Sequence, residues 1–304
     1  MVKLYHIHVY TYSRSFLIQI FICAYTNTFS RGSSESTLDE RYLFITIHNK
    51  IYVNNRQKNR ILLRHNETWT IINITNLINS WSMFITENDE IFLDNGYSNG
   101  RVDKWTLNGT YYGPVMQINS SCTSLFVDEI NNLYCSLVNE HRILKTQLTS
   151  SVATVVTVAG TGCPGPTPNM LDHPNGIFVD KNLNLYVADT DNNRIQCFLD
   201  GETHAQTMAG FGASIFVLLN QPTSVTLDAS GYMFIVDSGN HRIIRSIPNG
   251  FTCLFGCSDT NGASANQLSS PQTMAFDKYG NIFVTDFNNH RIQKINLITN
   301  TCRE

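Results

Sequence analysis

The sequence has few charged residues and no concentration of basic ones. Among 304 residues, Lys and Arg number 21, Asp and Glu number 24, and the net charge is −3. A nucleic-acid-binding surface needs Lys and Arg clustered in one segment or on one face, and no basic run or basic half occurs. The composition therefore argues against a nucleic-acid partner.

Long apolar runs, helical periodicity and metal-binding cysteine pairs are also missing. No apolar stretch approaches the roughly 20 residues of a membrane-spanning helix. There is no Cys-x-x-Cys pair, no Cys/His cluster with zinc-finger spacing and no Gly-x-Ser-x-Gly motif. Apolar residues come instead in short runs between turn-rich stretches, which is typical of an all-β protein. We expect no membrane span.

A short motif recurs in the C-terminal half of the chain. Its clear copies are Asp189–Ile195, Asp237–Ile243 and Asp286–Ile292, and in each copy the Asp stands five residues before an Arg. Each copy follows two short apolar runs separated by a turn. With the degenerate upstream copies, arginines recur at intervals of 41, 41, 52, 48 and 49 residues: Arg60, Arg101, Arg142, Arg194, Arg242 and Arg291. A period of about 40–50 residues marks a propeller or a solenoid.

Each repeat reads as four short strands, so the sequence predicts an all-β, six-bladed propeller of four-stranded antiparallel blades. We place a signal-like segment at 1–29, a polar linker at 30–40 and the propeller at 41–304. The predicted blades are 41–78, 79–119, 120–160, 170–210, 218–256 and 268–304. The sixth repeat stops after its third strand. We expect it to be incomplete unless the chain continues or an N-terminal strand completes it, for which Leu4–Tyr10 is the most strand-like candidate.

The N-terminal segment resembles a secretory signal. Lys3 and Arg14 precede an apolar run, Phe16–Ala24, which is followed by small and polar residues. That order is typical of a signal peptide with a long first region. The alternatives are a strand-like tail or a misassigned start codon. The signal interpretation predicts an extracellular protein.

Two cysteine spacings suggest disulfides, and four sequons suggest glycosylation. We expect the bridges Cys122–Cys135 and Cys253–Cys257, and the first would close a loop of about 13 residues and contribute roughly 3 kcal/mol. The alternative is reduced core cysteines, because Cys is often buried. The candidate glycosylation sites do not exceed the number expected by chance: Asn66, Asn73, Asn108 and Asn119.

At Asn240-His241-Arg242 and Asn289-His290-Arg291 the sequence resembles the NHL-repeat family of β-propellers. A Pro before the first strand also fits the family pattern, at Pro174, Pro222 and Pro271. The resemblance covers residues 41–304 and is clearest over 170–304. It implies a propeller fold but leaves the function open, because propellers carry many unrelated roles. One family type, a peptide-amidating lyase, binds metal through histidines from several blades.

The recurring polar residues are interpreted as architecture. An active site needs unlike residues in unlike blades, so we expect the residues that repeat at one turn to be structural: Asp189, Arg194, Asp237, His241, Arg242, Asp286, His290, Arg291, Arg142 and His141. His173 differs because the matching positions hold Gln221 and Ser270. A lone His is more often structural and a three-histidine zinc site needs three. We therefore predict no metal and no cofactor, with His173 as the one candidate ligand.

The favoured function is a monomeric, non-enzymatic, extracellular scaffold that binds a protein or a glycan. Recognition is expected in the loops between blades, especially 160–174, 210–222 and 256–271, because loops on a rigid scaffold carry most binding residues. The alternative is a metal-dependent lyase or hydrolase of the peptide-amidating-lyase type, with its site at the channel mouth. No catalytic residue can be assigned from the sequence.

Overall fold

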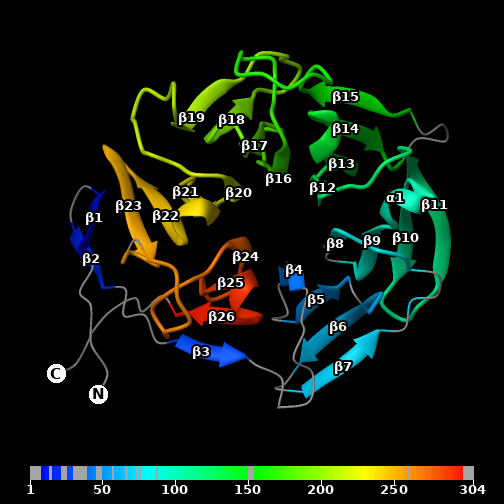
Figure 1. The fold of residues 1–304 in the computed structure, drawn as a ribbon, viewed down its shortest axis with the longest axis horizontal. Coiled ribbons are helices and arrows are strands. Elements are labelled where there is room, and N and C mark those ends of the chain that lie inside the picture. The colour runs from blue at the N-terminus through cyan, green and yellow to red at the C-terminus, as the bar shows by residue number, and fades with distance from the viewer. Residues whose placement is uncertain are drawn as a thin grey trace.

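In a computed structural model, six four-stranded antiparallel sheets surround one axis (Figure 1). The structure describes residues 50–296 except 57, 66–67, 73, 75–76, 87, 150–153 and 259, and before residue 50 it describes only the strand segments 8–13, 16–21, 26–29 and 40–45. The predicted six-bladed propeller is confirmed. Among the described residues, no helix has the length and hydropathy needed to cross a bilayer.

Five blades are formed by four consecutive strands each, in the order in which they occur in the chain. Blade 1 holds β4 (Glu40–Ile45), β5 (Ile51–Asn55), β6 (Arg60–His65) and β7 (Thr68–Ile72). Blade 2 holds β8 (Met83–Ile85), β9 (Glu90–Asp94), β10 (Arg101–Thr106) and β11 (Tyr111–Gln117), with the short helix α1 (Gly96–Asn99) between β9 and β10. Blade 3 holds β12 (Ser124–Val127), β13 (Asn132–Leu137), β14 (Arg142–Gln147) and β15 (Val156–Ala159).

The three clear motif copies lie in the last three blades. Blade 4 holds β16 (Pro174–Val179), β17 (Leu185–Asp189), β18 (Arg194–Phe198) and β19 (Gln206–Gly210). Blade 5 holds β20 (Pro222–Leu227), β21 (Met233–Asp237), β22 (Arg242–Ile247) and β23 (Gly250–Phe255). Blade 6 holds β24 (Pro271–Phe276), β25 (Ile282–Asp286) and β26 (Arg291–Ile295).

The sixth blade takes its fourth strand from the N-terminal region. Strand β3 (Thr26–Phe29) pairs antiparallel with β26, from Ile292↔Phe29 to Ile295↔Thr26. The blade is therefore closed, and residues 26–29, which we placed in the signal-like segment, are part of the propeller. Closure removes the open edge that β26 would otherwise present.

The strand expected to close the ring, Leu4–Tyr10, is not the one that does. His8–Tyr10 belong to β1 (His8–Ser13), which pairs with β2 (Phe16–Phe21) in a separate two-stranded sheet, and 4–7 lie outside the described residues. The closing strand is the one that most closely precedes blade 1 in the chain. The β1–β2 ladder pairs these two strands with each other, apart from the blades.

The core lies between the blades. Six clusters of buried apolar side chains each join residues of two neighbouring blades, and the last, which contains Ile51, Val53 and Phe283, joins blade 6 to blade 1. Because each blade covers its neighbour, both faces of a strand are buried, as in the fully buried β17. This explains the continuous apolar runs of the sequence.

The turn between the first and second strands is closed by an aspartate. Asp228 Oδ1 accepts the backbone N–H groups of Ser230 and Tyr232, both at 2.9 Å, and Asp128, Asp180 and Asp277 bind in the same way. The turn needs one residue with positive φ, which is Gly231 in blade 5 and Gly280 in blade 6. In blades 3 to 6, such Asp-capped turns are the local signal that ends the innermost strand.

Both expected disulfides are present. Cys122–Cys135 joins the start of blade 3 to β13 and is fully buried, and Cys253–Cys257 joins β23 to the following loop. Among the described residues, Cys163 is a free, exposed thiol and Cys197 is a buried one. Of the four sequons, Asn108 and Asn119 are exposed, whereas Asn66 and Asn73 lie outside the described residues. Glycosylation stays a prediction.

Ring closure by β3 can be tested by truncation. A chain that starts at residue 31 should lose about 2–4 kcal/mol in its free energy of unfolding relative to one that starts at residue 25, because four residue pairs of the ladder are lost and each hydrogen bond contributes about 1 kcal/mol net. Urea denaturation of the two chains measures the difference. Coincident unfolding curves would show that β3 does not close the ring.

Candidate functional site

One end of the strands carries two kinds of segment: the connections that enter each blade and the turns between its second and third strands. We call this end of the propeller the loop face. Each first strand begins there and runs to the Asp-capped turn at the opposite end. The three long linking loops, 160–173, 211–221 and 256–270, therefore share this face with the motif turns. Any site built from these segments belongs to the loop face.

The His or Asn of the motif fastens one blade to the next. Residues at this position have a left-handed backbone, with φ between 48° and 56° at Asn59, His141, Asn193, His241 and His290. Asn and His tolerate that conformation better than most residues. In blade 5, His241 Nδ1 accepts the N–H of Ser270 at 3.1 Å, and in blade 4, Asn193 Oδ1 accepts the N–H of Gln221 at 2.7 Å. The motif thus selects a side chain that fits the turn and also offers an acceptor.

The motif Asp and Arg organise the linking loop. Asp286 is fully buried. Its carboxylate accepts hydrogen bonds from the backbone N–H of Ser269 at 2.6 Å and from Nε of Arg291 at 2.7 Å. Arg291 then donates to the backbone carbonyls of residues 263, 264 and 267. Blade 4 repeats the arrangement with Asp189 and Arg194, and blade 5 with Asp237 and Arg242. We call this unit the Asp–Arg clasp.

In blades 3, 4 and 5 the backbone at the end of the fourth strand also lies very close to the backbone of the motif turn. The residue that ends the fourth strand is Gly160, Gly210 or Gly256, each with positive φ. A Cβ on any of them would lie 2.2 Å from the carbonyl oxygen of His141, Asn193 or His241. Glycine is required there because no side chain fits.

Blade 3 departs from the pattern. Leu137 replaces the Asp, and Arg142 pairs with Glu140 instead of a buried carboxylate. Both side chains of that pair are about one-third exposed. The turn of blade 3 therefore keeps its His but lacks the clasp.

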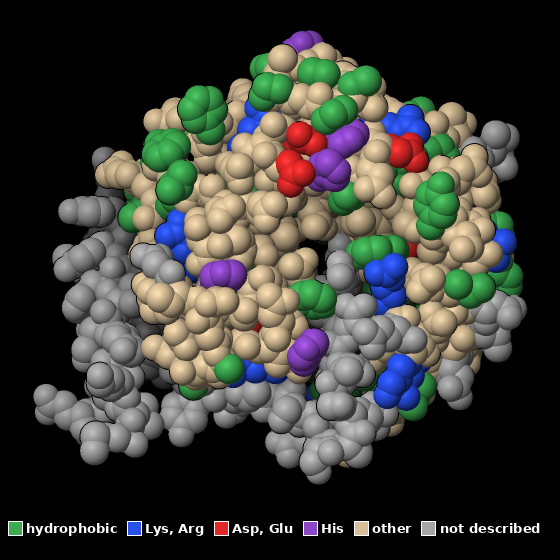
Figure 2. All heavy atoms as spheres, viewed as in Figure 1, with side chains coloured by type: hydrophobic (Ala, Val, Ile, Leu, Met, Phe, Trp, Pro, Cys, Tyr) green, Lys and Arg blue, Asp and Glu red, His purple; other side chains and the backbone are tan. Residues whose placement is uncertain are grey.

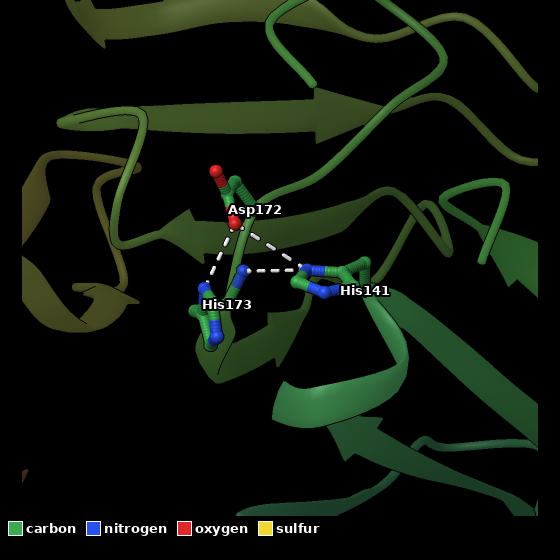
Figure 3. Close-up of side chains that lie close together, drawn as sticks. All are labelled: His141, Asp172 and His173. Atoms are coloured by element: carbon green, nitrogen blue, oxygen red, sulfur yellow. Dashed lines mark hydrogen bonds and ion pairs between the residues drawn. The ribbon is translucent and has the colours of Figure 1, made fainter. Parts of the chain in front are cut away.

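At the boundary of blades 3 and 4, His141, Asp172 and His173 lie together (Figure 3). His141 Nδ1 accepts the N–H of His173 at 3.2 Å and lies 3.4 Å from Asp172 Oδ1. His173 Nδ1 lies 2.8 Å from Asp172 Oδ1 and 2.8 Å from Asp191 Oδ2. The two rings are edge to face, with centroids 4.7 Å apart. His141, Asp172 and His173 are partly buried and Asp191 is exposed, with the side chain of His141 the most enclosed of the four.

This group is local to one boundary. Among the described residues it is the one set of three or more His, Cys, Asp or Glu side chains close enough to hold a metal ion. Figure 2 shows His and Asp/Glu side chains gathered near the top of the ring, where Figure 1 places the junction of blades 3 and 4. The sequence singled out His173 but missed Asp172 and Asp191. The available signal was that acidic residues occupy those two positions in blade 4 alone.

A second feature of the loop face is an exposed apolar loop between β19 and β20. Phe211 is 81% exposed, Phe216 63% and Leu218 69%, with Ile215 also exposed. Its C-terminal end is fixed, because Asp237 accepts the N–H of Asn220 and Arg242 donates to the carbonyl of Leu218. We call residues 211–218 the apolar loop. Figure 2 shows hydrophobic side chains on the upper left of the same face.

Asp94 is a buried carboxyl group that the sequence did not reveal as important. It accepts backbone N–H groups of Trp81, Gly96 and Cys122, and so connects blade 2 to blade 3. Burial raises its pKa from 3.8 to about 7, although these hydrogen bonds and the charge of Arg56 lower it. Asp94 is fully enclosed. We assign it to the architecture.

The Asp–Arg clasp predicts a large difference between two single substitutions. Asp286→Ala leaves a buried Arg291 without its partner and should cost about 3–5 kcal/mol of unfolding free energy. Glu140→Ala removes the partner of the more exposed Arg142 and should cost at most about 1 kcal/mol. Chemical denaturation gives both values. Equal losses would mean that the clasp adds nothing beyond a surface ion pair.

Asp94 predicts a pH dependence of stability. Because its folded-state pKa lies above the unfolded one, the protonated carboxyl favours the folded state, and that contribution is lost as pH rises from about 4 to about 7. One such group changes the unfolding free energy by at most about 1.4 kcal/mol per pH unit. Asp94→Asn, which cannot ionise, should flatten the curve between pH 4.5 and 6.5. Parallel curves for the variant and the parent chain would contradict the assignment.

Comparison with known proteins agrees with the repeats described above. The NHL repeat family model matches residues 171–198 and 268–295, within and just before blades 4 and 6. NHL repeat-containing protein 3 of Homo sapiens is 36% identical over 104 residues, which are 31% of this chain and 28% of the human protein. The match thus spans less than a third of that relative's length.

Solved structures share the fold at low sequence identity. An auxiliary nutrient binding protein from Bacteroides thetaiotaomicron has a TM-score of 0.66 at 18% identity, covering 84% of this chain and 68% of that one. Virginiamycin B lyase from Staphylococcus aureus has a TM-score of 0.58 at 14% identity, covering 84% and 80%. At these identities the likeness shows the fold alone. With NHL repeats matched in blades 4 and 6 and six sheets around one axis, the protein is a six-bladed β-propeller that contains NHL repeats.

Proposed function

We propose that the protein is an extracellular, non-enzymatic binding module whose loop face docks a protein partner. The observation that carries the proposal is the apolar loop. Single exposed apolar residues are ordinary on any surface, but a contiguous exposed group marks an interaction site. Here Phe211, Ile215, Phe216 and Leu218 fall within eight residues.

The chemistry of the apolar loop favours a protein over a lipid surface. Between Glu202 and Asp228 the sequence contains no Asp, Glu, Lys or Arg. Segments that insert into anionic membranes carry Lys or Arg beside their apolar residues. The nearest arginine of the clasp, Arg242, is held by Asp237 and by the carbonyl of Leu218. Aromatic and aliphatic side chains on a fixed loop are instead typical of the centre of a protein interface.

The extracellular part of the proposal rests on two features. Disulfides persist in oxidising compartments, and two are present among the described residues. The signal-like segment is the second, and cleavage just after residue 24 would leave β3 in place to close blade 6. A cut beyond residue 29 would remove that strand.

The lyase alternative has less support. A site at the channel mouth needs ligands or acid–base groups from several blades. The second residues of β16, β20 and β24 are Asn175, Thr223 and Gln272, which include no carboxylate or imidazole. His173 directly precedes β16, but Gln221 and Ser270 occupy the matching positions in blades 5 and 6. A structural neighbour is named as a lyase and another as a binding protein, so the fold permits both roles.

Substitutions in the apolar loop test the proposal. A photo-crosslinking residue at position 218 would capture the partner at the cell surface, and the partner would then be purified for affinity measurement. Phe211→Ser and Phe216→Ser should each weaken binding by about 10-fold or more, since burial of one such side chain contributes about 1.5–3 kcal/mol. Neither change should affect stability.

Tyr279 provides a matched control. It is 68% exposed and lies in the Asp-capped turn at the opposite end of blade 6. Tyr279→Ser should leave the affinity unchanged. Three results would contradict a protein–protein interface at the apolar loop. They are equal losses of affinity in all three variants, binding to phosphatidylserine vesicles through the same residues, and loss of binding after glycosidase treatment of the partner.

A further inference from the structure

The His and Asp side chains at the boundary of blades 3 and 4 break the symmetry of the repeat. The three positions that hold Asp172, His173 and Asp191 have equivalents defined by the same backbone hydrogen bonds. At the boundary of blades 5 and 6 these are Ser269, Ser270 and Asn288. At the boundary of blades 4 and 5 they are Asn220, Gln221 and Gly239. The scaffold therefore does not require imidazole or carboxylate there.

We propose that His141, Asp172 and His173 form a binding site for a divalent transition-metal ion, represented by Zn²⁺, that joins blade 3 to blade 4. Imidazole nitrogen and carboxylate oxygen are ordinary zinc ligands. Ca²⁺ and Mg²⁺ prefer sites made of oxygen ligands, in larger number for Ca²⁺, and a group with two imidazoles does not suit them. The chemistry of the donors thus selects the class of ion.

The geometry is close to that of a tetrahedral site. The ligand atoms that these residues offer all lie within 4.8 Å of one another. Ligands about 2.0–2.1 Å from a tetrahedral ion lie about 3.4 Å apart. His141 Nδ1 and Asp172 Oδ1 already have a separation of 3.4 Å, and His173 Nδ1 and Asp172 Oδ1, at 2.8 Å, need to open by about half an ångström. His173 is the more exposed of the two histidines and has room to do so.

Two further features bear on the ligand set. The N–H of His173 donates to His141 Nδ1 at 3.2 Å, so a metal ion bound through that nitrogen replaces a neutral hydrogen bond. Asp191 Oδ2 lies 2.8 Å from His173 Nδ1. Its carboxylate is placed to orient this ring or to take the fourth position of the ion, which in open sites belongs to water.

The repeat supplies substitutions that remove a ligand without disturbing the turn. Asn occurs naturally at the equivalent of His141, where Asn193 adopts the same left-handed backbone and accepts the same hydrogen bond. His141→Asn therefore keeps the connection between blades. His241→Asn makes the identical change two blades away, where the partner is Ser270 and the described residues form no such cluster. His173→Ser copies the residue at position 270.

The experiment is a titration of the full chain, stripped with chelator, with ZnCl₂ and separately with CaCl₂. The parent chain and His241→Asn should each bind one Zn²⁺ at this site with equal affinity, and Zn²⁺ should raise their melting temperatures equally. His141→Asn and His173→Ser should bind at least about 100-fold more weakly, since changes outside the ligands already cost 10–100-fold. CaCl₂ should give no comparable response.

Three results would overturn the proposal: no Zn²⁺ binding by the parent chain, equal binding by His141→Asn and His241→Asn, or a preference for Ca²⁺. The melting temperatures without metal show whether a variant is folded, so lost binding cannot be confused with lost structure. None of these substitutions lies in the apolar loop. Failure of the metal site and failure of the protein interface are therefore separate results.

Discussion

The structure depends on how each blade is fastened to the next at the loop face. A buried motif Asp accepts the N–H of the chain entering its blade and fixes an Arg, and that Arg holds the carbonyls of the linking loop. Beside it, a His or Asn in a left-handed turn accepts an N–H from the following blade. Because a buried charge is tolerated only when it is paired and hydrogen-bonded, neither Asp nor Arg can change alone. The fourth strand supplied by β3 gives blade 6 the same number of strands as the others.

This fastening explains why the loop face can carry function. The clasp uses only backbone atoms of the linking loops, so it holds their shape whatever their side chains are. The loop between β19 and β20 can therefore present apolar residues to solvent, and the loop before β16 can end in Asp172 and His173. Both segments adjoin the turn of blade 4 that contains Asp191 and Asn193. Rigid placement of loop side chains lowers the entropy lost on binding.

The same residue type serves two purposes in neighbouring blades. His241 accepts a hydrogen bond from the N–H of Ser270 and belongs to no group of His and Asp side chains among the described residues. His141 accepts the N–H of His173 and also lies beside Asp172. The interpretation that one histidine per turn is structural accounts for the hydrogen bond made by both. It does not account for the imidazole and carboxylates gathered around His141. Both roles use the same Nδ1 of His141, so a bound metal ion would take the place of the backbone hydrogen bond at this one boundary.

The sequence by itself determined the repeat, the number of blades and the four-strand pattern, and it suggested the two disulfides. These follow from local signals: apolar period, turn residues and cysteine spacing. The tertiary structure alone decided that β3 closes the ring, that Asp94 bridges blades 2 and 3, and that Asp172 and Asp191 face His173. Each depends on contacts between segments that are separated in the chain. Spacing along the chain carries no information about which side chains meet there, because the length and path of each linking loop decide it.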